Sequence, residues 1–281
     1  MKTLKKLLTL ATLPLAVMSC STDDDPVANN VTLTFNNTFE NTTIVLGDAS
    51  SSTATVNTSA EGQTHHFSEL KYVISNIRLI KADGSEFPYH VNDLDNGAIV
   101  VNQSKPETLN FVMSDIPSDE YTKIKFGLGV KTDLNTLDEA RFPNFYASAG
   151  ANDTEMHWEW GTGYRFTKIE GFYDTDNKTL SVHTGSTIEG EEGSYTQGVD
   201  AYRDITLDLT TAANVGKHAT TITIKADFDK LLSGKINTIT LGEGNATPST
   251  HTANNMVLYV DNLGGDGAAD ITGMFSITSV D

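Results

Sequence analysis

The sequence is nearly free of cysteine, with a single residue of this type, Cys20, among 281. A disulfide needs two cysteines, and thiolate-based zinc or iron–sulfur sites need several. The residues after Cys20 therefore hold no thiol nucleophile, disulfide or thiolate ligand. A site for a soft metal in this region would have to use histidine, methionine or an aromatic side chain.

Basic residues are also scarce, with 19 Lys and Arg against 37 Asp and Glu and a formal net charge of −18. This negative charge argues against nucleic acid or an anionic membrane surface as partner. The composition is rich in Thr, Asn, Asp, Ser and Gly, and 38% of the residues are hydrophobic. Such a composition is typical of many short strands joined by turns and excludes a fold of long helices.

Familiar catalytic motifs are absent: the sequence has no GxSxG, no HExxH, no Walker loop and no GxGxxG after a strand. We therefore expect a binding protein with no enzymatic activity of its own.

The first residues resemble an export signal. Three lysines precede an apolar run at 7–17, which is too short and too interrupted to span a bilayer, and a small residue, Ser19, precedes Cys20. We predict a lipoprotein signal peptide at 1–19, a lipidated Cys20, and a flexible acidic tether at 20–30. The alternative is an ordinary secretion signal with an incidental cysteine. Acidic residues behind the cysteine resemble the surface-export signal of Bacteroidetes lipoproteins, so the expected location is the outer membrane, on its periplasmic or cell-surface face.

From residue 31 to 281, short β-patterned runs alternate with turns, without a repeat or a change in composition. This pattern predicts one all-β domain, an antiparallel sandwich or barrel of about ten strands with at most one or two short helices. One run has a possible kink at Ser75–Asn76, and a short helix is expected at 133–141. The expected strands are 31–35, 71–80, 98–102, 109–113, 121–130, 164–173, 179–183, 205–209, 221–226, 236–241 and 255–260.

The most unusual segment is 156–164, which contains both tryptophans of the chain, Trp158 and Trp160. In a strand these two side chains would share one face with Met156, while His157 and Glu159 would point to the other. The simplest explanation of such a pair is an anchor in the hydrophobic core.

Two further histidines stand near strand ends, His183 before a turn and His251 before the run 255–260. Neutral imidazole binds copper, zinc and nickel, but a lone histidine at a strand end is usually a surface residue. The acidic clusters Asp93-Asp95-Asn96 and Asp174-Asp176-Asn177 could hold Ca²⁺, although neither has a full EF-hand loop and Asx turns explain both.

Several segments together resemble the MbnP family of bacterial copper-binding proteins. The stretch 72–79 (YVISNIRL) resembles the family's YxxSNIRL strand, and 121–130 is similar to its YtxixFxiGv strand. The stretch 156–166 (MHWEWGTGYRF) looks like its MxWxWxxGYxF signature, and 182–185 resembles its HxG segment. A late histidine, His251, falls where the family keeps one.

This resemblance implies a β-rich exported domain that binds copper. In the family a tryptophan can be oxidised to kynurenine by a partner di-haem peroxidase-like enzyme. Transferred to this chain, His183 and His251 become imidazole ligands, and either Trp158 or Trp160 becomes the oxidised residue. A third candidate ligand is His157, which strand alternation turns away from the tryptophans unless a bulge intervenes. Carboxylates available to orient the imidazoles are Glu159, Asp174 and Asp200.

The sequence therefore favours an envelope lipoprotein that binds copper for acquisition or storage. One alternative is a surface lipoprotein that binds glycans by stacking on exposed Trp158, Trp160 or Tyr164, and the other is a structural β-sandwich without metal. Burial of the tryptophans distinguishes these hypotheses, because a glycan platform must be exposed.

Overall fold

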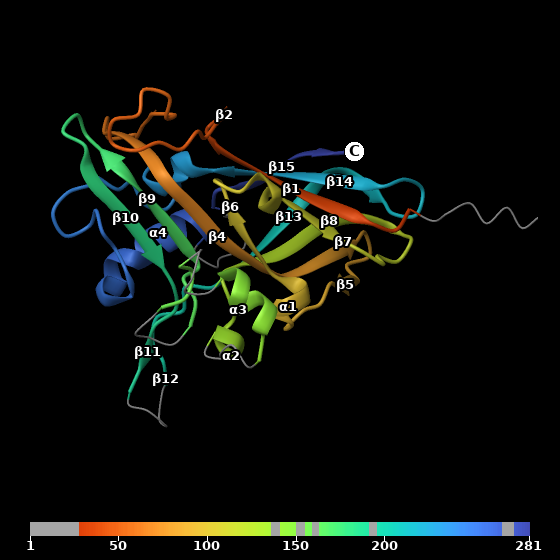
Figure 1. The fold of residues 1–281 in the computed structure, drawn as a ribbon. Coiled ribbons are helices and arrows are strands. Elements are labelled where there is room, and N and C mark those ends of the chain that lie inside the picture. The colour runs from red at the N-terminus through yellow and green to blue at the C-terminus, as the bar shows by residue number, and fades with distance from the viewer. Residues whose placement is uncertain (1–27, 136–140, 150–154, 159–162, 191–195, 266–272) are drawn as a thin grey trace, which may run out of the picture.

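The computed structural model describes residues 28–135, 141–149, 155–158, 163–190, 196–265 and 273–281. Most of the strands in these ranges belong to two sheets that pack face to face (Figure 1). Within the described ranges, no helix has the length and apolar character needed to cross a membrane.

The smaller sheet has β1 (Val31–Phe39) at its centre. This strand pairs in parallel with β14 (Thr220–Asp227), and β14 pairs in turn with β15 (Phe275–Val280). The other side of β1 pairs with β2 (Thr42–Thr43) and β7 (Asn110–Met113). The parallel pair differs from the purely antiparallel arrangement expected from the sequence, which gives no information on which distant strands become neighbours.

The larger sheet is built around β4, which runs over Thr64–Lys81 and is the longest strand described. Its main path has the order β10-β9-β4-β8-β13, all antiparallel. Three short strands also pair with β4. A separate two-stranded sheet, β11–β12, lies beyond the C-terminal end of β10 (Figure 1). The bounds of these elements are β3 (Asn57–Thr58), β5 (Glu86–Pro88), β6 (Ile99–Asn102), β8 (Glu120–Leu128), β9 (Thr167–Tyr173), β10 (Lys178–Thr184), β11 (Ile188–Glu189), β12 (Thr196–Gln197) and β13 (Arg203–Asn214).

The main hydrophobic core lies between the two sheets, where alternate side chains of each strand point inward. Aromatic rings join the layers: Phe35 of β1 contacts Tyr72 of β4 at 6.2 Å between ring centroids, and Phe126 of β8 contacts Phe275 of β15 at 5.1 Å. The β-rich fold predicted from the sequence is thereby confirmed, and the arrangement is sandwich-like, with no closed barrel in the described residues.

A second apolar cluster covers the outer face of the larger sheet. Outward side chains such as Val73 and Val100 pack there against short helices, which lie on the side away from the smaller sheet (Figure 1). These helices are α1 (Leu94–Gly97), α2 (Thr132–Asn135) and α3 (Pro143–Ala149). The described part of the chain also contains three 3-10 helices, η1 (Pro106–Leu109), η2 (Phe228–Leu231) and η3 (Thr250–Thr252).

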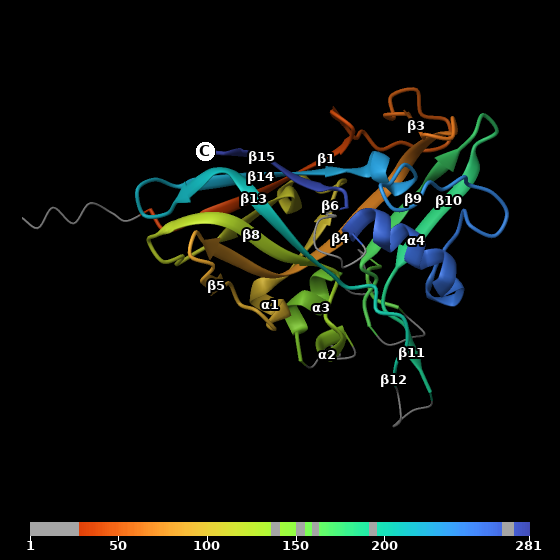
Figure 2. The same cartoon turned by 180° about the vertical axis from the view of Figure 1, so that it is seen from behind.

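The prediction of a strand at 255–260 is wrong, because this run lies within helix α4 (Ala253–Gly264), which packs on β10 (Figure 2). Its buried side chains Met256, Tyr259, Val260 and Leu263 follow the 3.6-residue period of a helix. With α4 the described residues hold four α-helices, more than the one or two expected.

A strand at 236–241 was also predicted, but only an isolated bridge between Ser233 and Thr238 forms there. The side chain of Asn262 in α4 engages both the amide (3.0 Å) and the carbonyl (2.9 Å) of Asn237, so these backbone groups bond to a helix side chain instead of a strand.

The kink at Ser75–Asn76 is confirmed. Strand β4 shifts register between Ser75 and Arg78, and Asn76 has φ +52°, a left-handed conformation that Asn tolerates better than most residues. Its side chain accepts a hydrogen bond from the Asn92 amide at 3.0 Å, which holds the loop before α1 against the sheet.

Candidate metal centre

His183 lies on the β9–β10 hairpin, whose tight turn spans 174–177 and includes two residues with positive φ. The register pairs His183 with Lys168 and Ser181 with Glu170. The neighbours Leu180 and Val182 are fully buried, whereas Ser181 and His183 lie on the opposite, outer face of the hairpin.

The His183 imidazole is held by a carboxylate. Its Nε2 lies 2.9 Å from Oε1 of Glu170 and 3.3 Å from Oγ of Ser181. Because an ionised carboxylate can only accept, Nε2 is the protonated donor in this pair. The hydrogen bond from His183 lowers the pKa of the Glu170 carboxyl, an effect that outweighs desolvation and is reinforced by the charge of Lys168.

Glu170 belongs to a group of charged residues on β4, on β9 and at the start of the segment 155–158. We call this group the charged ladder: Glu69, Lys71, Glu155, Lys168 and Glu170. The ammonium of Lys168, whose side chain is 6% exposed, lies 2.9 Å from Glu69, 2.5 Å from Glu155 and 3.8 Å from Glu170. Lys71 pairs with Glu69. Burial lowers the pKa of Lys168, but hydrogen bonds with Glu155 and Glu69 outweigh this effect and leave the pKa above its usual value.

Trp158 packs near His183. Its amide donates to the Gly163 carbonyl at 3.1 Å, and the Arg165 amide donates to the Met156 carbonyl at 2.7 Å, so 156–158 and 163–165 run antiparallel. Met156 and Trp158 are buried, as strand alternation predicts. The Arg165 guanidinium covers the indole at 4.2 Å, and the indole lies 6.2 Å from the His183 ring at an angle of 57°.

The segment that leads to His251 reaches the same place. It runs along the edge of β10 that does not pair with β9. There the amides of Ser181 and His183 donate to the carbonyls of Ala246 (2.9 Å) and Pro248 (3.0 Å). A Cβ atom placed on Gly185 would lie 3.4 Å from the indole nitrogen of Trp158 and 3.7 Å from a methyl of Thr250. The absence of a side chain at Gly185 thus lets the indole and η3 approach each other.

His251 itself is exposed on η3, which Ser249 and Thr252 close with a reciprocal capping box. Beside it lies an open hollow of about 420 Å³, lined by His251 and residues 252–255. The structure therefore brings together His183, Trp158 and the segment that carries His251, at one end of β10.

The third candidate ligand, His157, does not join this group. Its half-buried ring lies between Tyr146 (5.3 Å) and Tyr164 (5.1 Å), and burial lowers its pKa. Trp160 and Glu159 lie outside the described residues. In the ranges that the structure covers, no three His, Cys, Asp or Glu side chains form a preformed metal cluster.

The acidic clusters considered for Ca²⁺ have other partners. Asp93 caps α1 by accepting from the Asp95 amide at 3.1 Å, and Asp95 accepts from the Phe145 amide at 2.8 Å. Asp174 pairs with Lys178 at 3.2 Å. These contacts agree with Asx turns and caps, and they use the carboxylates that a calcium ion would need.

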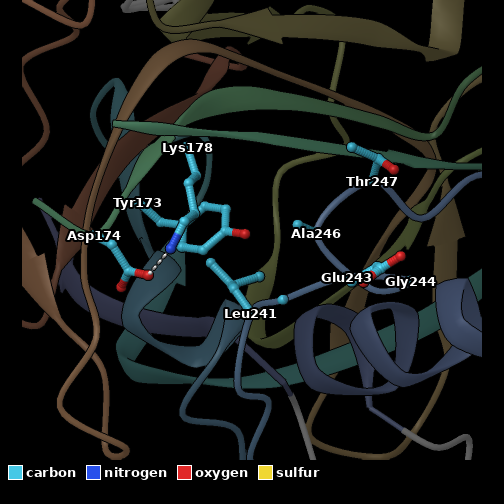
Figure 3. Close-up of a pocket in the computed structure, with 9 residues that line it drawn as sticks. Tyr173, Asp174, Lys178, Leu241, Glu243, Gly244, Ala246 and Thr247 are labelled. Atoms are coloured by element: carbon cyan, nitrogen blue, oxygen red, sulfur yellow. Dashed lines mark hydrogen bonds and ion pairs between the residues drawn. The ribbon is translucent and has the colours of Figure 1, made fainter. Parts of the chain in front are cut away.

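A cleft of about 440 Å³ lies at the hairpin turn, at the opposite end of β10 from His183 (Figure 3). The Lys178 ammonium extends over the ring of Tyr173 at its mouth (5.8 Å to the centroid). This cleft contains none of the predicted ligands; it is lined by Tyr173, Asp174, Lys178, Leu241, Gly242, Glu243, Gly244, Ala246 and Thr247.

The carboxylate that contacts His183 was not among those predicted from the sequence, which were Glu159, Asp174 and Asp200. In the structure Asp174 pairs with Lys178 at the turn, and Asp200 accepts from the Ser186 hydroxyl at 3.1 Å. The available signal was the turn at 174–177, because a hairpin centred there places residue 170 diagonal to residue 183.

The family model described as MbnP matches residues 28–254. The chain belongs to the MbnP family. A solved structure, MbnP from Methylosinus trichosporium, has a similar fold, with a TM-score of 0.58, 14% sequence identity, and coverage of 88% of this chain and 97% of that chain. Among curated proteins no sequence matches. The resemblance predicted from the sequence is confirmed, and MbnP proteins are linked to copper-related function.

The glycan-binding alternative requires exposed aromatic side chains, and two of its three candidates are buried. Trp158 is 5% exposed and covered by Arg165, and Tyr164 is fully buried. Neither ring offers a face on which a sugar could stack, and Trp160 lies outside the described residues.

Proposed function

We propose that this MbnP protein is a cell-envelope lipoprotein that binds copper for acquisition or storage, anchored in the outer membrane by a lipid on Cys20. The supporting observation is the meeting of His183, Trp158 and the His251 segment at the end of β10. A thiol-free set of imidazoles beside an aromatic ring fits copper chemistry, and the net charge of −18 raises the local cation concentration.

His183 and His251 are the proposed imidazole ligands of the copper cargo. Access to them would come through the hollow beside His251, which is open to solvent. The oxidised state of the site would involve Trp158, the tryptophan that lies 6.2 Å from His183.

To produce that oxidised state, a partner di-haem peroxidase-like enzyme would use peroxide as the oxidant. The peroxide would be reduced to water while the C2–C3 bond of the indole is cleaved and two oxygen atoms are inserted. Hydrolysis would then release formate and leave kynurenine, whose aryl amine and ketone can act as donors. Because Trp158 is buried, we expect Trp158 to be oxidised either before it packs or when the paired segments 156–158 and 163–165 separate from β10.

The test is metal analysis and intact mass of the mature protein, residues 20–281, purified from the native envelope. We expect about one copper per chain, with strong loss in His183→Ala and His251→Ala. His218→Ala is the matched control, because His218 is an exposed histidine far along the chain from both ligands. Retention of copper in both ligand variants, or its absence from wild type in copper-replete cells, would overturn the proposal.

The same preparation tests the anchor and the modification. Cys20→Ala is expected to abolish acylation and release the protein from membranes. The peptide containing Trp158 is expected to carry the mass change of one oxygen gained and one carbon lost, and deletion of the partner enzyme should restore the unmodified mass. An unmodified Trp158 peptide in copper-loaded protein would leave a site made by histidines alone.

A further inference from the structure

The two ring nitrogens of His183 have different surroundings. Nε2 is engaged by Glu170 at 2.9 Å and by Ser181 at 3.3 Å. Within the described part of the chain, Nδ1 has no hydrogen-bond partner, and the side chain is 18% exposed. We propose that His183 binds metal through Nδ1, and that Glu170 is a positioning residue that holds the ring by accepting from Nε2–H. This inference rests on the proposed function.

The geometry of the hairpin makes Glu170 a fixed acceptor. Antiparallel pairing places residue 170 opposite Ser181 and diagonal to His183, within reach of a long side chain. The backbone amide of His183 is bonded to Pro248, so the ring is attached to a strand that is paired on both edges. Release of Nε2 would therefore require a side-chain rearrangement rather than a small backbone shift.

The charged ladder holds Glu170 in turn. Lys168, almost fully buried, lies between the carboxylates of Glu69, Glu155 and Glu170 and limits the positions that each can take. If a metal occupied Nε2, Glu170 would lose its hydrogen bond while half-buried, or would itself become a ligand. Binding through Nδ1 keeps every contact of the ladder in place.

The ladder also carries one more negative than positive charge, with three carboxylates against the ammonium groups of Lys71 and Lys168. The excess lies next to the Nε2 side of His183. A carboxylate that accepts from one imidazole nitrogen fixes the tautomer and makes the other nitrogen a better donor to a metal. The described contacts of Glu170 place it in this role, at a distance from any ligand position on Nδ1.

The direct test is ¹⁵N NMR of residues 21–281 labelled on histidine and titrated anaerobically with Cu(I), which is diamagnetic. The His183 signals are assigned by their loss in His183→Gln. We expect Nε2 to remain a protonated, pyrrole-type nitrogen while the Nδ1 signal moves on metal binding. A shift of Nε2 with protonation of Nδ1 would overturn the inference but leave the proposed function standing. Absence of any Cu(I) binding would overturn both.

Variants of Glu170 supply the second readout. Glu170→Ala is expected to lower Cu(I) affinity by about 10- to 100-fold, and Glu170→Gln, whose carbonyl can still accept from Nε2–H, should recover part of the loss. Glu69→Gln is the matched control, because it removes the same charge from the ladder without a contact to His183, and its effect should be clearly smaller. Equal losses in Glu69→Gln and Glu170→Ala would refute a positioning role and indicate a general effect of charge.

Discussion

Acid sensitivity is expected from His65, a histidine on β4 that is 1% exposed and packs between Phe39 (5.3 Å) and Phe67 (5.8 Å). Neither of its ring nitrogens has a hydrogen-bond partner in the described structure. Burial lowers the pKa of His65 from 6.5 to about 4, an effect that the Gln63 backbone and the nearby Asp229 only partly offset. The folded protein therefore disfavours protonation of this ring.

The sign of the pH effect follows directly. Between pH 6.5 and about 4 the unfolded chain binds a proton at His65 and the folded chain does not, so the free energy of unfolding decreases as the pH falls. At about 1.4 kcal/mol per pKa unit, the loss from this residue reaches about 2 kcal/mol at pH 5. Above pH 6.5 its contribution to the pH dependence vanishes.

The measurement is urea denaturation of wild type and His65→Leu at pH 7 and pH 5. We expect wild type to lose about 2 kcal/mol more than the variant between these two pH values. The variant's stability at pH 7 also contains packing changes, but these cancel in the comparison across pH. His157, whose pKa is lowered as well, contributes equally to both proteins. Parallel pH profiles for the two proteins would refute the burial argument.

Substitutions at three further positions test other parts of the structure. Gly185→Ala places a Cβ 3.0 Å from the Tyr164 carbonyl and 3.4 Å from the Trp158 indole nitrogen, so a change in Trp fluorescence and weaker copper binding are expected; an unchanged spectrum and affinity would contradict this packing. Lys168→Met leaves the ladder's carboxylates without their shared cation and should cost about 2 kcal/mol in urea denaturation; a more stable variant would show that the ladder is not stabilising. Asn76→Ala loses its hydrogen bonds and strains a left-handed residue, so thermal unfolding should show a cost of about 2 kcal/mol, whereas Asn76→Gly should recover the part due to φ.

Local patterns in the sequence were informative about local structure. The alternation in 31–35 and 121–130 and the kink at Ser75–Asn76 depend on neighbouring residues, and the structure contains them. The pattern in 255–260 was misjudged because a short apolar run fits both periods, and only the spacing through Leu263 identifies the helix.

The site could be predicted only in part, since its contacts join segments that the sequence does not relate. The resemblance pointed to His183, His251 and Trp158, but the spacing gave no reason to place Thr250 against Gly185 or Arg165 over the indole. These contacts depend on how the segments 156–158, 163–165 and 246–251 pack beside β10. The contact between Glu170 and His183 could have been predicted from the sequence, because it follows from the register of the β9–β10 hairpin.

The parallel pairing of β1 with β14 has a consequence for the order of events during synthesis. Strand β1 pairs with a strand that is far along the chain, since Val31 lies opposite Thr220. Most of the chain must therefore be synthesised before the smaller sheet can form. The segment that brings His251 to β10 emerges later still. A nascent chain therefore lacks the proposed copper site, and any loading with copper would follow the completion of the polypeptide, in whichever compartment the finished protein folds.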